Sequence, residues 1–158
     1  MIGAASPTPS QRIAAECARA GGGPALIAGC VALLSERPDD VDDRLISVLG
    51  GDPARRVLDG GDGGRSGYWP RVWAARGLLH AWDDQTEVSG ELADAATAAI
   101  IGALGDDAWR VREMAAKVIA RHRVGQAFDA VAALRDDPVP RVRAAAARAV
   151  VLLTVSQA

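Results

Sequence analysis

A short triplet that recurs along the second half of the chain constrains the fold more than any other feature. It reads Arg71-Val72-Trp73, then Arg110-Val111-Arg112, then Arg141-Val142-Arg143. The last two copies start 31 residues apart, and each follows an aspartate, Asp106 or Asp137, by the same interval. Self-similarity at a fixed period of this length is typical of stacked helical repeats, in which each unit covers the apolar face of its neighbour.

The composition supports helices rather than strands. Alanine is abundant, aromatic residues make up 4% of the chain and β-branched runs are short, which favours closely packed helices. Apolar residues also recur at helical spacing after each triplet, in columns that a helix must bury against its neighbours. The spacing predicts an all-α fold.

The chain divides into three stretches, which 158 residues can combine in one domain, residues 1–158. Residues 8–50 form degenerate N-terminal helices, the first of which opens on a capping box at Thr8 and Gln11. Residues 51–67 form a glycine-rich loop, flexible around residues 59–67, which lacks the lysine of a phosphate-binding loop. Residues 68–155 form the regular repeats.

Two segments carry a resemblance to a known family. They read Gly105-Asp106-Asp107-Ala108-Trp109-Arg110-Val111-Arg112-Glu113-Met114-Ala115-Ala116 and Asp136-Asp137-Pro138-Val139-Pro140-Arg141-Val142-Arg143-Ala144-Ala145-Ala146-Ala147-Arg148-Ala149. Both resemble HEAT-like repeats of the type first noted in phycobilisome bilin lyases. The resemblance implies an α-α superhelix, a short solenoid of antiparallel helix pairs with about 8–9 helices, that acts through protein–protein contacts. The first copy departs from the pattern, with Gly67 in place of the aspartate and Trp73 in place of the second arginine.

Charge and cysteine content indicate which partners and which compartment we expect for the chain. The formal net charge is -2, and residues 68–158 hold 11 basic and 11 acidic side chains, so no overall field attracts nucleic acid or membrane. Cys17 and Cys30 fall in apolar helical patterns and are expected as free thiols of a reducing compartment. Apolar stretches such as 150–155 are too short to span a bilayer. We expect a cytoplasmic protein that has no membrane segment and no signal peptide.

The arginine column of the triplets permits two interpretations. Arginine forks suit phosphate, but the alternating aspartates favour a structural ladder that ties loops to helix starts. The second helix of each pair should line the concave face, where Glu91, Asp94 and Asp129 point outward. That face would repel phosphates. We therefore expect a basic protein or peptide partner, find no basic cleft, and do not expect nucleic acid.

Tryptophans beside arginine give the second group of candidates. Trp69 and Trp73 are four residues apart and share a helix face, and Trp109 precedes Arg110 at a first-turn position. Exposed tryptophan with arginine is typical of interface hot spots. The alternative is that tryptophan fills core volume left by many alanines. We favour the core for Trp82, leave both interpretations open for Trp69, Trp73 and Trp109, and consider Trp109 with Arg110 the best surface candidate.

No constellation in the sequence supports catalysis, a cofactor or a metal. His80 falls at a packing position and is expected to be partly buried, while His122 ends a helix where a cation complements terminal carbonyls. There is no HExxH and no cysteine pair with ligand spacing. The acidic run 39–43 is explained by helix capping rather than by calcium. We predict no catalytic residue, no cofactor and no metal site.

The leading functional hypothesis is a non-catalytic scaffold that presents a repeat-built groove to a protein or peptide. Two alternatives stay open: a DNA-binding or DNA-repair protein of the HEAT-like type, and a helper similar to bilin lyases that holds a chromophore. The last predicted helix, 138–155, carries Val150, Val151, Leu152, Leu153 and Val155 with no predicted partner after it. Terminal repeats need a polar outer face, so we expect a homodimer through this helix. The alternative is that the preceding helices cover both of its sides.

Overall fold

The computed structural model describes residues 3–82 and 88–156, and this part of the chain is built from helices without any strand. The α-helices are α1 (Pro9–Cys17), α2 (Gly22–Leu34), α3 (Asp43–Gly50), α4 (Ala54–Leu58), α5 (Tyr68–Ala81), α6 (Gly90–Ala103), α7 (Trp109–His122), α8 (Phe128–Ala133) and α9 (Pro140–Val155). Short 3-10 turns lie at η1 (Pro38–Asp40), η2 (Gly61–Ser66), η3 (Gly125–Ala127) and η4 (Leu134–Asp136). The prediction of an all-α fold is confirmed.

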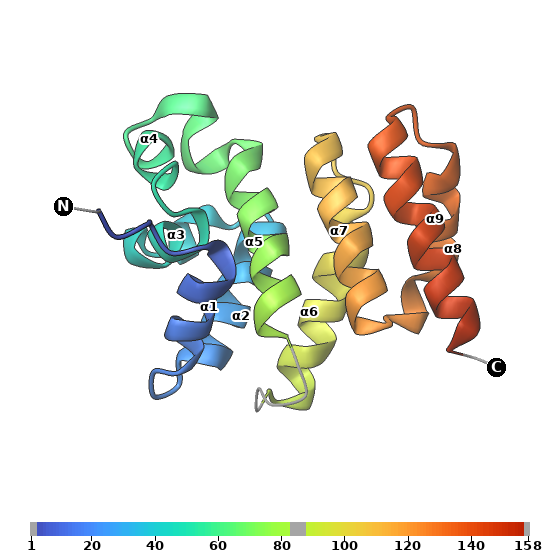
Figure 1. Cartoon of the computed structure of the whole chain (residues 1–158), viewed down its shortest axis with the longest axis horizontal. Helices are drawn as coiled ribbons and strands as arrows, with labels where there is room; N and C mark the ends of the chain where they lie inside the picture. Colours follow the sequence, from blue (N-terminus) through green and yellow to red (C-terminus); the bar gives the residue numbers. More distant parts are fainter. Residues whose placement is uncertain (1–2, 83–87, 157–158) are drawn as a thin grey trace.

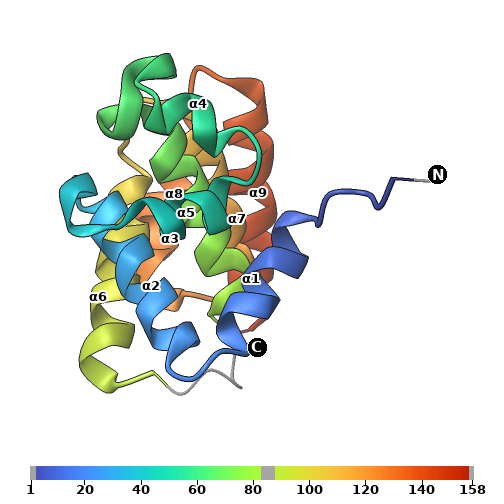
Figure 2. The same ribbon diagram turned by 90° about the vertical axis from the view of Figure 1, so that its left-hand side faces the viewer.

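The helices form two layers. In the first layer α5, α7 and α9 lie side by side, with α7 in contact with both others (Figure 1). In the second layer α6 packs on α2 and α7, and α8 packs on α9. Figure 2 shows α2 and α6 at one side of the molecule and α9 at the other. The first layer and the second layer therefore present separate surfaces.

Local signals in the sequence start several helices where they were expected. The capping box of α1 is present: the Gln11 backbone N–H donates to Thr8 Oγ1 (3.3 Å) and the Thr8 N–H donates to Gln11 Oε1 (2.8 Å). Asp42 caps α3 by accepting from the Leu45 N–H at 2.8 Å. These side chains satisfy backbone donors that the first turn of a helix leaves free.

Two ion pairs connect neighbouring helices of the first layer; Asp137 is buried, and the other three residues are partly buried. Arg71 donates through Nε and Nη2 to the carboxylate of Asp106, at 2.7 and 3.1 Å. Arg112 makes the same two-pronged contact with Asp137, at 2.8 and 3.2 Å. Each aspartate also accepts the backbone N–H two residues ahead, at the start of the next helix. The predicted ladder of aspartates and arginines forms at Arg71, but its second arginine is Arg112 and not the predicted Arg110, which lies over the Trp109 ring.

The register of the ladder differs from the alignment of the triplets. Because α5, α7 and α9 begin at Tyr68, Trp109 and Pro140, Arg71, Arg112 and Arg143 are each the fourth residue of a helix. In this register three columns are buried in all three helices: Pro70, Val111, Val142; Ala74, Ala115, Ala146; and Gly77, Val118, Ala149. The first triplet is therefore shifted by two residues from the other two.

One apolar core extends through both layers, from Ile13 in α1 to Leu153 in α9. One tight contact joins α5 to α2 and α3, where Gly77 faces Cys30 and Leu49 so closely that a Cβ would lie 2.7 Å from Cys30 Sγ. Cys30 is fully buried, and burial raises the pKa of its thiol. No disulfide joins Cys17 to Cys30 in the described part of the chain, and Cys17 is only half-buried.

The glycine-rich stretch 51–67 differs from the predicted flexible loop. It contains α4 and the turn η2, and Asp62, Gly63 and Gly64 take positive φ angles there. Arg65 connects η2 to η1 and α3, because its guanidinium donates to the Asp43 carboxylate and to the carbonyls of Pro38 and Val41. Hydrogen bonds that the composition does not reveal hold this stretch against the rest of the chain.

Candidate functional site

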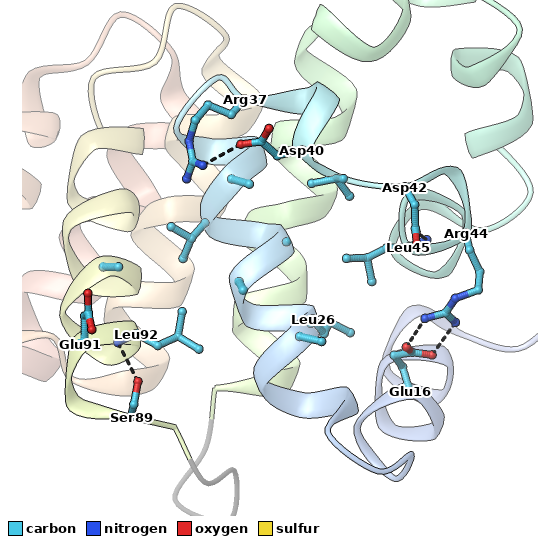
Figure 3. A pocket seen from close by; sticks show the side chains of 17 residues that line it. Glu16, Leu26, Arg37, Asp40, Asp42, Arg44, Leu45, Ser89, Glu91 and Leu92 are labelled. Atoms are coloured by element: carbon cyan, nitrogen blue, oxygen red, sulfur yellow. Dashed lines mark hydrogen bonds and ion pairs between the residues drawn. The ribbon is translucent and has the colours of Figure 1, made fainter.

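A groove of about 740 Å³ opens on the second layer, between α2, α3 and α6 (Figure 3). We name it the α2–α6 groove. Its floor is apolar and includes Leu26, Val31, Leu45, Leu92 and several alanines. Its rim is charged, with Glu16, Arg37, Asp40, Asp42, Arg44 and Glu91. Pockets of this size and character commonly take a ligand whose apolar part fills the floor and whose polar groups meet the rim.

Most charged side chains of this rim form an ion pair or a hydrogen bond within the chain, and Glu91 is the exception. Arg44 donates to both carboxylate oxygens of Glu16 at 3.0 and 2.5 Å, and Arg37 donates to Asp40 at 2.7 Å. The hydrogen bond from Arg44 holds the pKa of Glu16 below its usual value even though Glu16 is buried. Glu91 is exposed and has no ion pair or side-chain hydrogen bond within the described residues. Its carboxylate is available to a ligand.

The three acids predicted for the concave face are exposed but are not brought together. Glu91 lines the α2–α6 groove, while Asp94, three residues further along α6, does not. Asp129 lies on α8, outside the groove. Glu16, Asp40 and Asp42 were not among the predicted site residues, because the groove is assembled from helices that lie far apart in the sequence.

The predicted aromatic and arginine residues do form a cluster, at the starts of α5, α7 and α9. The Arg110 guanidinium carbon lies 4.4 Å from the Trp109 ring and 5.5 Å from the Trp69 ring. Arg141 covers Trp109 at 5.5 Å, and Tyr68 packs beside Trp69 at 5.1 Å. We name these residues the aromatic cluster. Trp109 and Trp69 are half-buried by the arginines that stack on them.

The predictions for Trp73 and for His80 need correction. Trp73 is 4% exposed and packs on Gly50, so it belongs to the core and cannot contact a partner. His80 is exposed rather than partly buried, and the pKa of its imidazole is lowered by partial desolvation and by the charges of Arg76 and Arg121. His122 ends α7 as predicted, with Nε2 2.9 Å from the Leu78 carbonyl oxygen.

A second groove, of about 580 Å³, lies on the first layer between α7 and α9. We name it the α7–α9 groove. Its lining contains five cationic side chains and a single carboxylate: Lys117, Arg121, Arg123, Arg141, Arg148 and Glu113. The expectation that the chain lacks a basic cleft is therefore wrong. Acids and bases are balanced along the sequence, but the fold gathers these cations on one surface.

A weak signal for this groove was present in the sequence. Arg110, Lys117 and Arg121 are seven and four residues apart, and Arg141 and Arg148 are seven apart, so each set lies on one helix face. Counting charge by segment hides such a stripe. The stripe is visible only when charge is counted by helix face.

Two further properties concern the described residues as a whole. No group of three or more His, Cys, Asp or Glu side chains among them is placed to hold a metal ion. None of their helices combines the length and the apolar character that crossing a bilayer requires. Comparison with family models, curated proteins and solved structures gave no match for this chain.

Proposed function

We propose that the chain is a non-catalytic interaction module, a HEAT-like superhelical array whose α2–α6 groove binds a peptide segment of a partner protein. The segment has an apolar side chain for the groove floor and a basic residue for the rim. The observation that carries this proposal is the combination of an apolar floor with an unpaired carboxylate, Glu91, at its edge.

The charge of the rim supports the choice of a basic partner. The rim has four carboxylates and two guanidiniums, and both guanidiniums already pair with carboxylates of the rim. A lysine or arginine of the peptide meets a favourable potential at Glu91, and an acidic peptide is repelled. The apolar floor supplies affinity by removing a side chain of the peptide from water.

The proposal that the fold is a HEAT-like array is supported by the ladder. Arg71–Asp106 and Arg112–Asp137 connect successive first-layer helices in the same way. The buried columns of α5, α7 and α9 fall at equal positions from the helix starts. Equal contacts between successive units are typical of solenoids, in which each unit contacts only its neighbours.

Peptide selection tests the groove. Peptides of about 12 residues, selected from a random displayed library on the wild-type protein, are expected to share a basic residue next to an apolar one. Glu91→Lys should weaken the binding of these peptides at least about tenfold, since like charges then meet at the rim. Asp94→Lys makes the same change on the same helix outside the groove, and it should leave the affinity within about twofold.

The affinities would be measured by fluorescence anisotropy with labelled peptides. Equal losses in the Glu91→Lys and Asp94→Lys proteins would argue against the groove as the binding site. Selection of acidic peptides, or of none, would argue against the proposed partner class.

Self-association through α9 is a second expected property. Val151 and Val155, four residues apart on α9, are 60% and 66% exposed and are the exposed large apolar side chains of the described chain. A second copy would cover them. Light scattering at high micromolar concentration should give a mass above that of one chain, and Val151→Lys with Val155→Lys should restore the monomer. A wild-type monomer at that concentration would rule this interface out.

A further inference from the structure

The α7–α9 groove has no part in the peptide binding proposed above. It is lined by α7, α9 and Arg123, whereas the α2–α6 groove is lined by α1, η1, α2, α3, α6 and the residues beside them. The two grooves share no residue. The helices that line them belong to different layers (Figures 1 and 2). A ligand of the α7–α9 groove would therefore bind independently.

Most of the positive charge in this groove lacks a counter-charge. Glu113 is 8% exposed, and its Oε1 accepts from Lys117 and Arg141, both at 3.1 Å. Arg123 donates to the Leu152 carbonyl at 2.7 Å and to Ser156 Oγ, which are neutral acceptors. Arg121 and Arg148 are exposed and have no carboxylate within 4.0 Å among the described residues. Five cations and one carboxylate leave a formal charge of +4 along the groove.

This exposed positive surface is confined to the α7–α9 groove. Arg76 occupies on α5 the place that Lys117 has on α7 and Arg148 has on α9, counted from the helix starts. Its guanidinium, however, belongs to the contact of α5 with α3: Nη2 donates to the Leu49 carbonyl at 2.9 Å, and Nε is buried without a hydrogen-bond acceptor.

The dimensions of the groove favour a narrow, extended anion. The lining residues of α7 lie within 113–121, which rise about 12 Å along the helix, so the groove is elongated and takes its cations from two neighbouring helices. Arginine, which supplies four of the five cations, suits phosphate oxygens through its planar fork. Val151 and Val155, the exposed large apolar side chains, do not line the groove, so it offers no apolar side chain of that kind for insertion into a membrane.

The aromatic cluster lies at one end of the α7–α9 groove. Arg141 belongs to both, since it lines the groove and covers the Trp109 ring. Proteins that bind single-stranded nucleic acid combine aromatic rings with a cationic groove: bases stack on the rings, and phosphates lie along the cations. A duplex holds its bases in its interior, where they cannot reach these rings.

We propose that the α7–α9 groove binds the phosphodiester backbone of a single-stranded nucleic acid, with bases directed to the aromatic cluster. About three phosphates fit beside the cations of the groove. The dependence of log affinity on log salt should then have a slope of about -2, since each neutralised phosphate of a single strand contributes about -0.7.

The test compares two charge reversals of equal size. The groove protein carries Arg121→Glu and Arg148→Glu, and the control carries Arg55→Glu and Arg135→Glu, at exposed positions outside the groove. Each pair takes the formal net charge from -2 to -6. Anisotropy of a labelled oligothymidylate of about 20 nucleotides, at 50 and 200 mM salt, should show at least about tenfold weaker binding for the groove protein. The control should stay within about threefold of wild type, and circular dichroism should show all three proteins folded.

Several outcomes would overturn this proposal. They are equal losses in both variants, no binding to wild type at 50 mM salt, tighter binding of a duplex of the same length, and tighter binding of polyglutamate. The Glu91→Lys protein separates this proposal from the peptide-binding proposal, because it should bind the oligonucleotide as wild type does. Each proposal can thus fail while the other holds.

Discussion

Asp137→Ala is expected to lower the free energy of unfolding by about 3–5 kcal/mol, the effect of removing one partner from a buried ion pair. The Asp137 side chain is 4% exposed and that of Arg112 is 14% exposed. Without Asp137, the guanidinium of Arg112 keeps only the carbonyls of Asp106 and Asp107 as acceptors. The Val139 N–H at the start of α9 also loses its acceptor. Urea denaturation followed by circular dichroism measures this loss.

The adjacent Asp136 provides the control for this prediction. It is exposed and forms no ion pair within the described residues, so Asp136→Ala should change stability by less than about 1 kcal/mol. Similar losses in the two variants would show that Arg112–Asp137 does not hold α7 to α9.

The same pair predicts how stability depends on pH. The hydrogen bonds from Arg112 hold the pKa of Asp137 below its usual value of 3.8 in the folded chain. A group whose pKa is lowered by folding stabilises the fold above its unfolded pKa and loses this contribution as pH falls through its folded pKa. The stability difference between wild type and Asp137→Ala should therefore be constant near neutral pH and decrease as the pH falls below about 4. A difference that grows on acidification would contradict this.

Replacing glycine by alanine should have opposite effects in α5 and α6. A Cβ at Gly77 would lie 2.7 Å from Cys30 Sγ and 2.8 Å from Leu49 Cδ2, both of which belong to fully buried residues. Gly77→Ala should therefore destabilise the fold by about 1–3 kcal/mol, as overpacking of a core does. A Cβ at Gly102 meets nothing within 4 Å. Gly102→Ala should stabilise the fold by up to about 1 kcal/mol, because alanine is the better helix former.

Thermal and urea unfolding of the two glycine variants would measure both signs in one experiment. Because both substitutions add the same methyl group inside a helix, a common effect on helix propensity cancels in their difference. Stabilisation by Gly77→Ala would mean that α5 can move away from α2 and α3 without cost, and that the contact at Cys30 is not tight.

The parts of the fold that the sequence predicted depend on local chemistry. Thr8 and Gln11 cap α1 as expected because the capping box needs only residues three apart. Residues 51–67 were predicted incorrectly as a loop because Arg65 orders them through acceptors 22–27 residues away. The register of α5 was missed by two residues because the triplet compares residue types, whereas the contact of Arg71 with Asp106 depends on where the helix begins.

The candidate sites were less predictable than the fold, for a related reason. Glu91 was found from its position on a second-layer helix, but its neighbour across the α2–α6 groove, Leu45, comes from α3. The sequence leaves the position of Trp73 open between core and surface in part because the space that receives its ring is provided by Gly50, on another helix. The α7–α9 groove was missed because net charge averages over faces that the fold separates.

Arg143 continues the ladder in α9 and offers a position at which the chain can be extended by design. Arg143 occupies the same place in α9 as Arg112 in α7, and it makes the same contact with the loop before its helix, through the Asp137 carbonyl at 2.7 Å. No carboxylate of the described chain pairs with its guanidinium. The partners of Arg71 and Arg112 follow them by 35 and 25 residues. A helix pair grafted after α9, with an aspartate at such a distance beyond Arg143, would therefore form the same ion pair with the Arg143 guanidinium. A chain lengthened in this way would keep both grooves and enlarge the surface beside them.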